Sequence, residues 1–241
     1  MGLLKKYFRE EKFAKSFNAK KALLEDGRFS MKWEERSPCL NDATSTTGFD
    51  AHYLFHTAWA ARVLAKNKPE LHIDISSCLR FVSLVSAFVP VHFYDYRPAE
   101  LNLSGLESNK ADLMNLPFPD HSVQSLSCMH VIEHIGLERY GDLLDAQGDL
   151  KAITELKRVI TPGGSLLFVV PLGEKAIIQY NAHRIYTYQL ILSYFSDMQL
   201  VDFSYINDAG KYIPKAQEID TVGQIYGCGC FHFQANSSTK A

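Results

Sequence analysis

SLLFVVPL, residues 165–172, is a near-continuous apolar run of the kind expected for a strand that is covered on both faces. The preceding segment, GDLKAITELKRVI (148–160), places Leu150, Ile153 and Leu156 on one helical face. Asp149 lies near the positive end of this helix, and Thr161-Pro162-Gly163-Gly164 predicts that the helix stops and the chain turns. These signals together predict a helix that packs against a buried strand.

The same alternation of strand and helix extends in both directions from this segment. Strands are predicted at 71–75, 91–96, 122–132, 199–205 and 225–234, and helices at 51–67 and 187–195. Such alternation is typical of a parallel sheet with helices on its faces. We therefore predict a Rossmann-like, doubly wound α/β fold with a mostly parallel seven-stranded sheet. Residues 1–70 are expected to form an N-terminal helical extension or cap, and residues 71–241 one compact domain.

Composition limits the partners and the compartment. The formal net charge is -2, so nucleic acid is not an expected partner. The five cysteines lack the paired spacing of a zinc site and are typical of reduced thiols in a cytoplasmic protein. Residues 1–30, roughly helical in pattern with a basic excess, predict a packing helix or, alternatively, weak docking on a membrane surface or an acidic partner. No apolar run approaches the length of about 20 residues that a membrane span needs.

Polar residues follow the predicted strands, where ligands bind to open parallel sheets. Asp95, at the end of the second strand, can accept hydrogen bonds from both hydroxyls of a ribose, or it can be an acid in a surface turn. Asp112 can lie near the amine of a purine, or it can only form a turn. Asp74, Ser76 and Ser77 close the first strand, and His130 ends the fourth.

Two stretches carry a resemblance to a known family. ADLMNLPFPDHSVQSLSCMHVIEHI (111–135) and LKRVITPGGSLLFVVPLG (156–173) resemble class I S-adenosylmethionine-dependent methyltransferases. FDAHYLFHTAWAARVL, IDISS, FYDYRP and NAHRIYT extend the similarity to a methyltransferase-like family associated with bacterial surface-polysaccharide biosynthesis. The resemblance implies S-adenosylmethionine as cofactor and a sugar or glycan-linked acceptor, methylated at oxygen.

The resemblance also implies roles for the candidate residues. Asp74, Ser76 and Ser77 would hold the methionine end of the cofactor, Asp95 the ribose and Asp112 the adenine side, with His130 also in the cofactor site. The family pattern has glycines after the first strand, whereas this chain has Ser76, Cys78 and Arg80. Serine can still form the turn, and Arg80 can either pair with the cofactor carboxylate or occlude the site. An intact pocket and a degenerate one both fit the sequence.

Methylation of a hydroxyl needs a general base, and imidazole is the usual one near neutral pH. His134 is the first candidate and His183 the second; each can instead be a structural hydrogen-bonding group. Arg184 is expected to bind an anionic acceptor, or to form a salt bridge with a nearby acid. Tyr186 is expected to offer a stacking face for a sugar, or to pack within the fold.

Three further interpretations complete the predictions. No metal site is expected, because no HExxH motif or closely spaced ligand set occurs. His52, Tyr53 and His56 lie on the helix before the first strand, which can cover the cofactor or serve only as a cap. Cys228 and Cys230 are expected to be packed thiols of a strand. The rival functions are a non-catalytic module that binds a glycan precursor or a partner protein, and a nucleotide-sugar oxidoreductase, which the missing GxGxxG disfavours.

Overall fold

The computed structural model describes residues 2–237, with side chains from residue 10 onward. Contacts divide the chain into two units, Met1–Phe49 and Asp50–Ala241. The first unit contains helix α1 (Gly2–Leu24) and a short turn of helix, η1 (Trp33–Glu35). The rings of Phe13 and Phe17 contact Trp33 within this unit. The segment 36–50 contains no helix or strand.

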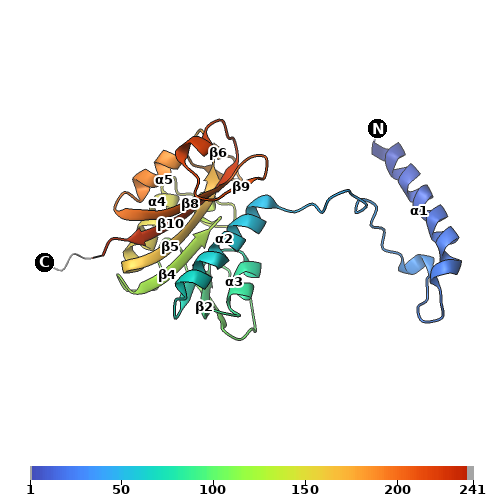
Figure 1. The fold of residues 1–241 in the computed structure, drawn as a ribbon, viewed down its shortest axis with the longest axis horizontal. Coiled ribbons are helices and arrows are strands. Elements are labelled where there is room, and N and C mark those ends of the chain that lie inside the picture. Colours follow the sequence, from blue (N-terminus) through green and yellow to red (C-terminus); the bar gives the residue numbers. More distant parts are fainter. Residues whose placement is uncertain (1, 238–241) are drawn as a thin grey trace. The chain divides into compact units, whose positions relative to one another are not determined.

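The second unit is an eight-stranded sheet with helices on both faces (Figure 1). The sheet order is β3-β2-β1-β4-β5-β10-β8-β9. Its strands are β1 (His72–Ile75), β2 (Val91–Asp95), β3 (Leu106–Lys110), β4 (Val123–Met129), β5 (Ile160–Leu172), β8 (Met198–Ile206), β9 (Tyr212–Ile213) and β10 (Gly227–Ala235). A separate hairpin pairs β6 (Ile177–Gln179) with β7 (His183–Ile185).

The strands from β1 to β5 run parallel, whereas β10 is inserted antiparallel between β5 and β8. The expected doubly wound architecture is therefore present, with eight strands rather than seven. No range was predicted from the sequence for β3 or for β9, which has two residues and pairs only with β8.

Two apolar cores lie on opposite faces of the sheet. One face is covered by α2 (Ala51–Asn67) and α3 (Leu79–Val85), which bury Trp59 and Phe81. The other is covered by α4 (Gly148–Val159) and α5 (Tyr188–Tyr194), which bury Leu156 and Ile191. Helix α2, which the sequence analysis assigned to the N-terminal extension, lies within the second unit. No helix of the described residues is long and apolar enough to span a membrane.

The segment Thr161–Gly164 departs from its prediction in one respect. It was expected to separate helix from strand, but the strand already begins at Ile160, directly after α4. The pairing partner of Val123 is Ile160, whereas that of Ser125 is Ser165, so the turn is accommodated as an irregularity within β5. Gly163 has a φ of +75°, which explains why glycine is used at this point.

Candidate functional site

A cavity of about 380 Å³ lies beyond the carboxyl ends of β1, β2 and β4. This is the edge at which open parallel sheets bind ligands, and the volume is in the range of small-molecule sites. We call it the first cavity. Six of the predicted site residues line it: Ser76, Ser77, Asp95, Asp112, His130 and His134.

Serine forms the loop after β1, where the family pattern has glycine. Ser76 takes up the left-handed conformation, with a φ of +55°, and its amide donates to the carbonyl of Tyr94 at 2.7 Å. The Ser77 hydroxyl accepts a hydrogen bond from the amide of Met129 at 3.1 Å, which ties the loop to β4. Arg80 is exposed and does not line the first cavity, so it does not occlude the site.

Asp74 is fully buried beneath this loop and does not line the cavity. Its Oδ1 accepts from the amide of Ser77 at 3.0 Å, and its Oδ2 accepts from the hydroxyl of Ser127. Burial raises the pKa of Asp74 to about 6, although the hydrogen bonds from the two serines oppose this. Asp74 therefore supports the loop and is not placed to contact a ligand in the cavity.

Asp95 and Asp112 line the cavity and also form local turns. Asp95 Oδ1 accepts from the amide of Arg97 at 2.7 Å, and Asp112 Oδ1 accepts from the amide of Met114 at 2.9 Å. The turn-forming and ligand-facing interpretations of these residues are therefore compatible. Each turn holds its carboxylate at the edge of the sheet where hydroxyl and amine donors can reach it.

A second cavity of about 520 Å³ adjoins the first, because Tyr53, His130, His134 and Tyr140 line both. His183 lines only this second cavity, together with residues of α2 and of the segment after β8. The two candidate bases therefore face a common space.

His134 contacts both Ala182 and Arg139. Its Nδ1 lies 2.8 Å from the carbonyl of Ala182, which also accepts from Arg139 Nη1 at 2.7 Å, and 3.1 Å from Arg139 Nη1 itself. Donation from Nδ1 to the carbonyl leaves the lone pair on Nε2, whereas donation from Arg139 to Nδ1 places the proton on Nε2. Burial lowers the pKa of His134, and the Glu133 carboxylate only partly opposes this. His134 is thus suited to accept a proton at neutral pH.

His183 is held less firmly. Its ring stacks on Tyr226 at 5.0 Å and meets His134 at 6.2 Å, and its buried Nε2 has no hydrogen-bond partner among the described residues. Burial lowers the pKa of His183 too. This imidazole is also neutral near pH 7.

His130 occupies the boundary between the cavities, with a φ of +58°. Its Nδ1 lies 2.9 Å from Glu133 Oε1, and its Nε2 lies 3.3 Å from Cys228 Sγ. Burial lowers the pKa of His130, but its contacts with Cys228 and Glu133 outweigh burial and raise the pKa to about 10. Burial also raises the pKa of the Cys228 thiol.

Arg184 and Tyr186 line neither cavity. Both contact the buried Asp149, Tyr186 through its hydroxyl at 2.9 Å and Arg184 through Nε at 3.5 Å. Arg184 also donates to the carbonyl of Ile135 at 2.7 Å. The structure therefore corrects the expected contacts with substrate: these side chains join α4, β7 and the segment after η2 (Ile132–His134).

Several lining residues were given no functional role from the sequence: Tyr96, Glu133, Arg139, Tyr140 and Tyr226. Tyr140 lies in the segment between η2 and α4, which has no periodicity that could have indicated it. The guanidinium groups of Arg97 and Arg139 lie 5.0 Å and 5.1 Å from its ring. Glu133 is next to His134 in sequence, and a search for acids that orient histidines could have found it.

Comparison with known proteins supports the fold. A family model described as Caenorhabditis protein of unknown function, DUF268, matches residues 120–221, less than half of the chain. No curated protein matches the sequence. The YcgJ protein from Bacillus subtilis is similar in structure, with a TM-score of 0.54, 13% identity, and 76% of this chain and 99% of that chain covered.

Two similar structures are of named methyltransferases. The 1,6-didemethyltoxoflavin-N1-methyltransferase from Burkholderia thailandensis has a TM-score of 0.54 at 9% identity, with 76% of this chain and 79% of that chain covered. The N-methyltransferase NodS from Bradyrhizobium japonicum has a TM-score of 0.52 at 14% identity, with 77% and 87% covered. Both structures contain S-adenosylhomocysteine. The second unit thus has the Rossmann-like fold of S-adenosylmethionine-dependent methyltransferases.

Proposed function

We propose that this protein is an S-adenosylmethionine-dependent methyltransferase that uses the first cavity for the cofactor. The observation that carries the proposal is the convergence of Ser76, Ser77, Asp95 and Asp112 on one cavity at the carboxyl edge of the sheet. Two structures with this fold contain S-adenosylhomocysteine, which is the product form of that cofactor.

The residues present fit the cofactor. Ser76 adopts the left-handed turn that glycine usually supplies, so the first loop is formed without glycine. The carboxylates of Asp95 and Asp112 are suited to accept hydrogen bonds from ribose hydroxyls and an adenine amine. Ser76 and Ser77 would face the methionine end, with Asp74 supporting them from beneath.

The second cavity is the proposed acceptor site. When bound, the cofactor supplies a methyl group that is already activated on sulfur, so the chain mainly aligns the acceptor and removes a proton. His134, which lines both cavities, would accept the proton of an acceptor hydroxyl; His183 is the second candidate. The sugar or glycan-linked acceptor and the role in surface-polysaccharide biosynthesis are proposed from the sequence resemblance.

Calorimetric titration with S-adenosylhomocysteine tests the cofactor site before an acceptor is known. We expect saturable binding that weakens at least tenfold in Asp95→Ala. Asp197→Ala is the matched control, because Asp197 is an exposed acid that lines neither cavity. Circular dichroism of each variant distinguishes a lost contact from a lost fold.

No binding to correctly folded protein would reject the methyltransferase assignment and favour the non-catalytic module. Binding that Asp95→Ala leaves unchanged would reject the ribose assignment alone. With an acceptor in hand, His134→Ala should reduce turnover at least a hundredfold while cofactor affinity stays within threefold. Full turnover in both His134→Ala and His183→Ala would show that neither is the base.

A further inference from the structure

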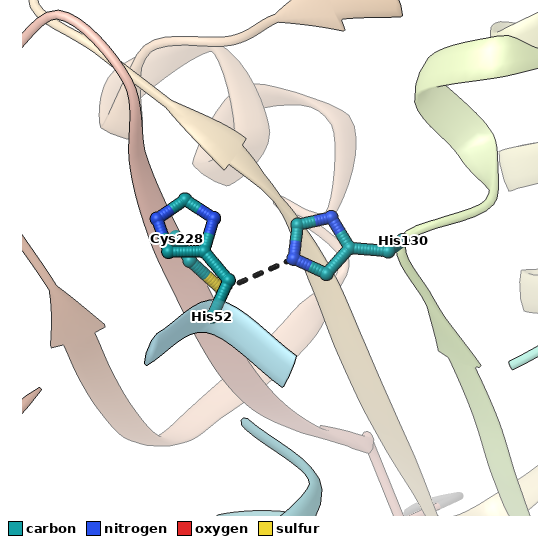
Figure 2. A group of neighbouring side chains, drawn as sticks. All are labelled: His52, His130 and Cys228. Atoms are coloured by element: carbon teal, nitrogen blue, oxygen red, sulfur yellow. Dashed lines mark hydrogen bonds between the residues drawn. The ribbon is translucent and has the colours of Figure 1, made fainter. Parts of the chain in front are cut away.

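Three side chains from distant parts of the chain converge beside the second cavity. His52 comes from the first turn of α2, His130 from the end of β4 and Cys228 from the start of β10 (Figure 2). One nitrogen or sulfur atom from each lies within 4.8 Å of the other two. We call this group the His-His-Cys cluster.

The spacing of the cluster suits a bound metal ion. With zinc bonds of about 2.0–2.1 Å to nitrogen and about 2.3 Å to sulfur, tetrahedral ligand atoms are about 3.3–3.6 Å apart. His130 Nε2 and Cys228 Sγ are already 3.3 Å apart. The rings of His52 and His130 are nearly parallel, at 8° and 5.9 Å, so the His52 ring must rotate before the in-plane lone pairs of both rings point at one ion.

A carboxylate orients the central histidine. Glu133 Oε1 lies 2.9 Å from His130 Nδ1, and the Glu133 side chain is 1% exposed. Hydrogen bonding of Nδ1 to a carboxylate directs Nε2 toward the cluster, as is usual for histidines that bind metals. The other carboxylate oxygen of Glu133 is buried without a hydrogen-bond partner among the described residues, so a nearby cation would offset the cost of its burial.

A second histidine of α2, His56, also has a buried nitrogen without a partner among the described residues, close to His130. His56 is fully buried one turn after His52, and its ring meets His130 edge-on at 5.1 Å. Its Nδ1 donates to the carbonyl of His52 at 2.7 Å, so Nε2 carries a lone pair, and that nitrogen has no partner among the described residues. Buried lone pairs without donors are costly, and a metal ion bound to the cluster would offset part of that cost.

We propose that His52, His130 and Cys228 bind a divalent ion of the zinc class. Two imidazole nitrogens and one thiolate favour zinc and similar ions over magnesium and calcium, which prefer oxygen ligands. On binding, the ion replaces the protons on Cys228 Sγ and His130 Nε2, which leave to solvent, and metal–sulfur and metal–nitrogen bonds form. His52 and His130 line the second cavity, so the fourth position faces that space and can hold a water or an acceptor oxygen.

This metal site does not depend on the proposed methyl transfer. No metal site was expected from the sequence. The metal alone is therefore the probe. The tag-free full-length chain is freed of metal with a chelator and titrated with Co²⁺, and then with Zn²⁺. We expect one equivalent of Co²⁺ to give a thiolate-to-metal charge-transfer band and the visible bands of a tetrahedral ion, and Zn²⁺ to remove both.

Variants assign the ligands. Cys228→Ser and His52→Ala should each weaken binding at least a hundredfold and abolish or shift these bands. Glu133→Gln should weaken binding by about 10- to 100-fold through the orientation of His130. Cys128→Ser and His92→Ala are matched controls, because Cys128 is equally buried in the other core and His92 lies outside the cluster; both should bind as the original chain does.

His52→Ala is the variant least expected to disturb folding, because His52 is only partly buried and lies in the first turn of a helix. Circular dichroism verifies the fold of each variant. A folded chain that binds no Co²⁺ would overturn the proposal. So would a charge-transfer band that survives unchanged in both Cys228→Ser and His52→Ala, since the ion would then be bound elsewhere.

Discussion

At the scale of single residues, a buried chain of hydrogen bonds links β1 to β4 beneath the candidate site. Ser127 donates to Asp74, so its oxygen must accept from His72 Nε2, at 2.9 Å. Nδ1 of His72 is then left to accept from Ser125 at 2.8 Å. One tautomer of neutral His72 therefore satisfies every group in the chain and holds Asp74 under the first loop.

His72 should make stability fall in acid. Complete burial lowers its pKa from 6.5 to about 3, so below pH 6.5 only the unfolded chain takes up the proton. The contribution of His72 to the free energy of unfolding is fully present above pH 6.5. Below pH 6.5 it decreases by about 1.4 kcal/mol per pH unit. Asp74 acts in the opposite direction, because its raised pKa of about 6 makes stability fall as pH rises through that value.

His72→Gln isolates this effect, since Asp74 is present in both chains and cancels in their difference. The variant should be less stable at pH 7, and its deficit should shrink by about 2 kcal/mol when the pH is lowered from 6.5 to 5. Urea unfolding at both pH values measures the difference. A deficit that is independent of pH would mean that His72 is not kept neutral in the folded protein.

Ser76 gives a second prediction at this scale, because its φ of +55° penalises side chains branched at Cβ. Ser76→Gly should remain within about 1 kcal/mol of the original stability, whereas Ser76→Val should lose about 2 kcal/mol. Ser83→Val, in the helical backbone of α3, is the control and should cost less than about 1 kcal/mol. Equal losses in Ser76→Val and Ser83→Val would refute the strained conformation.

At the scale of elements, the strands with strong apolar patterns were predictable and the weakly patterned ones were not. The runs at 71–75, 91–96, 122–132 and 165–172 correspond to β1, β2, β4 and β5. Strand β3 has the sequence LESNK and buries only Leu106, because it lies at the edge of the sheet. Its pairing depends on β2 and not on its own periodicity, so the sequence alone could not define it.

The candidate site was predictable for a related reason. Residues at or shortly after the carboxyl ends of strands, such as Ser76, Asp95 and His134, are brought together by the parallel topology itself. For Arg184 and Tyr186 the alternatives of a salt bridge and of packing within the fold agree with the structure, but their partner, Asp149, could not be named because it is distant in sequence. The His-His-Cys cluster was missed likewise, since its members are separated by 78 and 98 positions, which no local motif describes.

The contact between Arg184 and Asp149 should stabilise the packing of β7 against α4. Both side chains are less than a tenth exposed, so removing the arginine leaves a buried carboxylate unpaired. Arg184→Ala should cost about 3 kcal/mol or more in the free energy of unfolding, measured with urea. Arg80→Ala, at an exposed position, should cost less than about 0.5 kcal/mol.

A double variant tests the cause of that loss. Asp149→Asn removes the unpaired charge, so Arg184→Ala with Asp149→Asn should be less destabilised than the two separate losses added together. Strict additivity would mean that the two groups do not interact. If Arg184→Ala lowered the free energy of unfolding by less than about 1 kcal/mol, the contact with Asp149 would not stabilise the packing. Arg184 would then again be a candidate for binding a ligand.

At the scale of the whole molecule, the two proposed sites belong to one unit, Asp50–Ala241, and share His130. A ligand that binds only the folded state stabilises it by about 2.7 kcal/mol at a concentration 100 times its Kd. For a unit of this size, that corresponds to a rise in Tm of about 5–10 °C. Each ligand should therefore raise the unfolding temperature of the unit as a whole.

Substitutions should separate the two effects. In Asp95→Ala, S-adenosylhomocysteine should raise the Tm by at most about half as much as in the original chain, whereas Zn²⁺ should raise it fully; in Cys228→Ser the Zn²⁺ shift should be the reduced one and the S-adenosylhomocysteine shift should be complete. Scanning calorimetry of the metal-free chain with each ligand measures both shifts, and Asp197→Ala should keep both. Loss of both shifts in Asp95→Ala would show that its carboxylate supports the cleft generally. A Zn²⁺ shift that persists in Cys228→Ser would remove the thiolate from the metal site and leave the cofactor assignment intact.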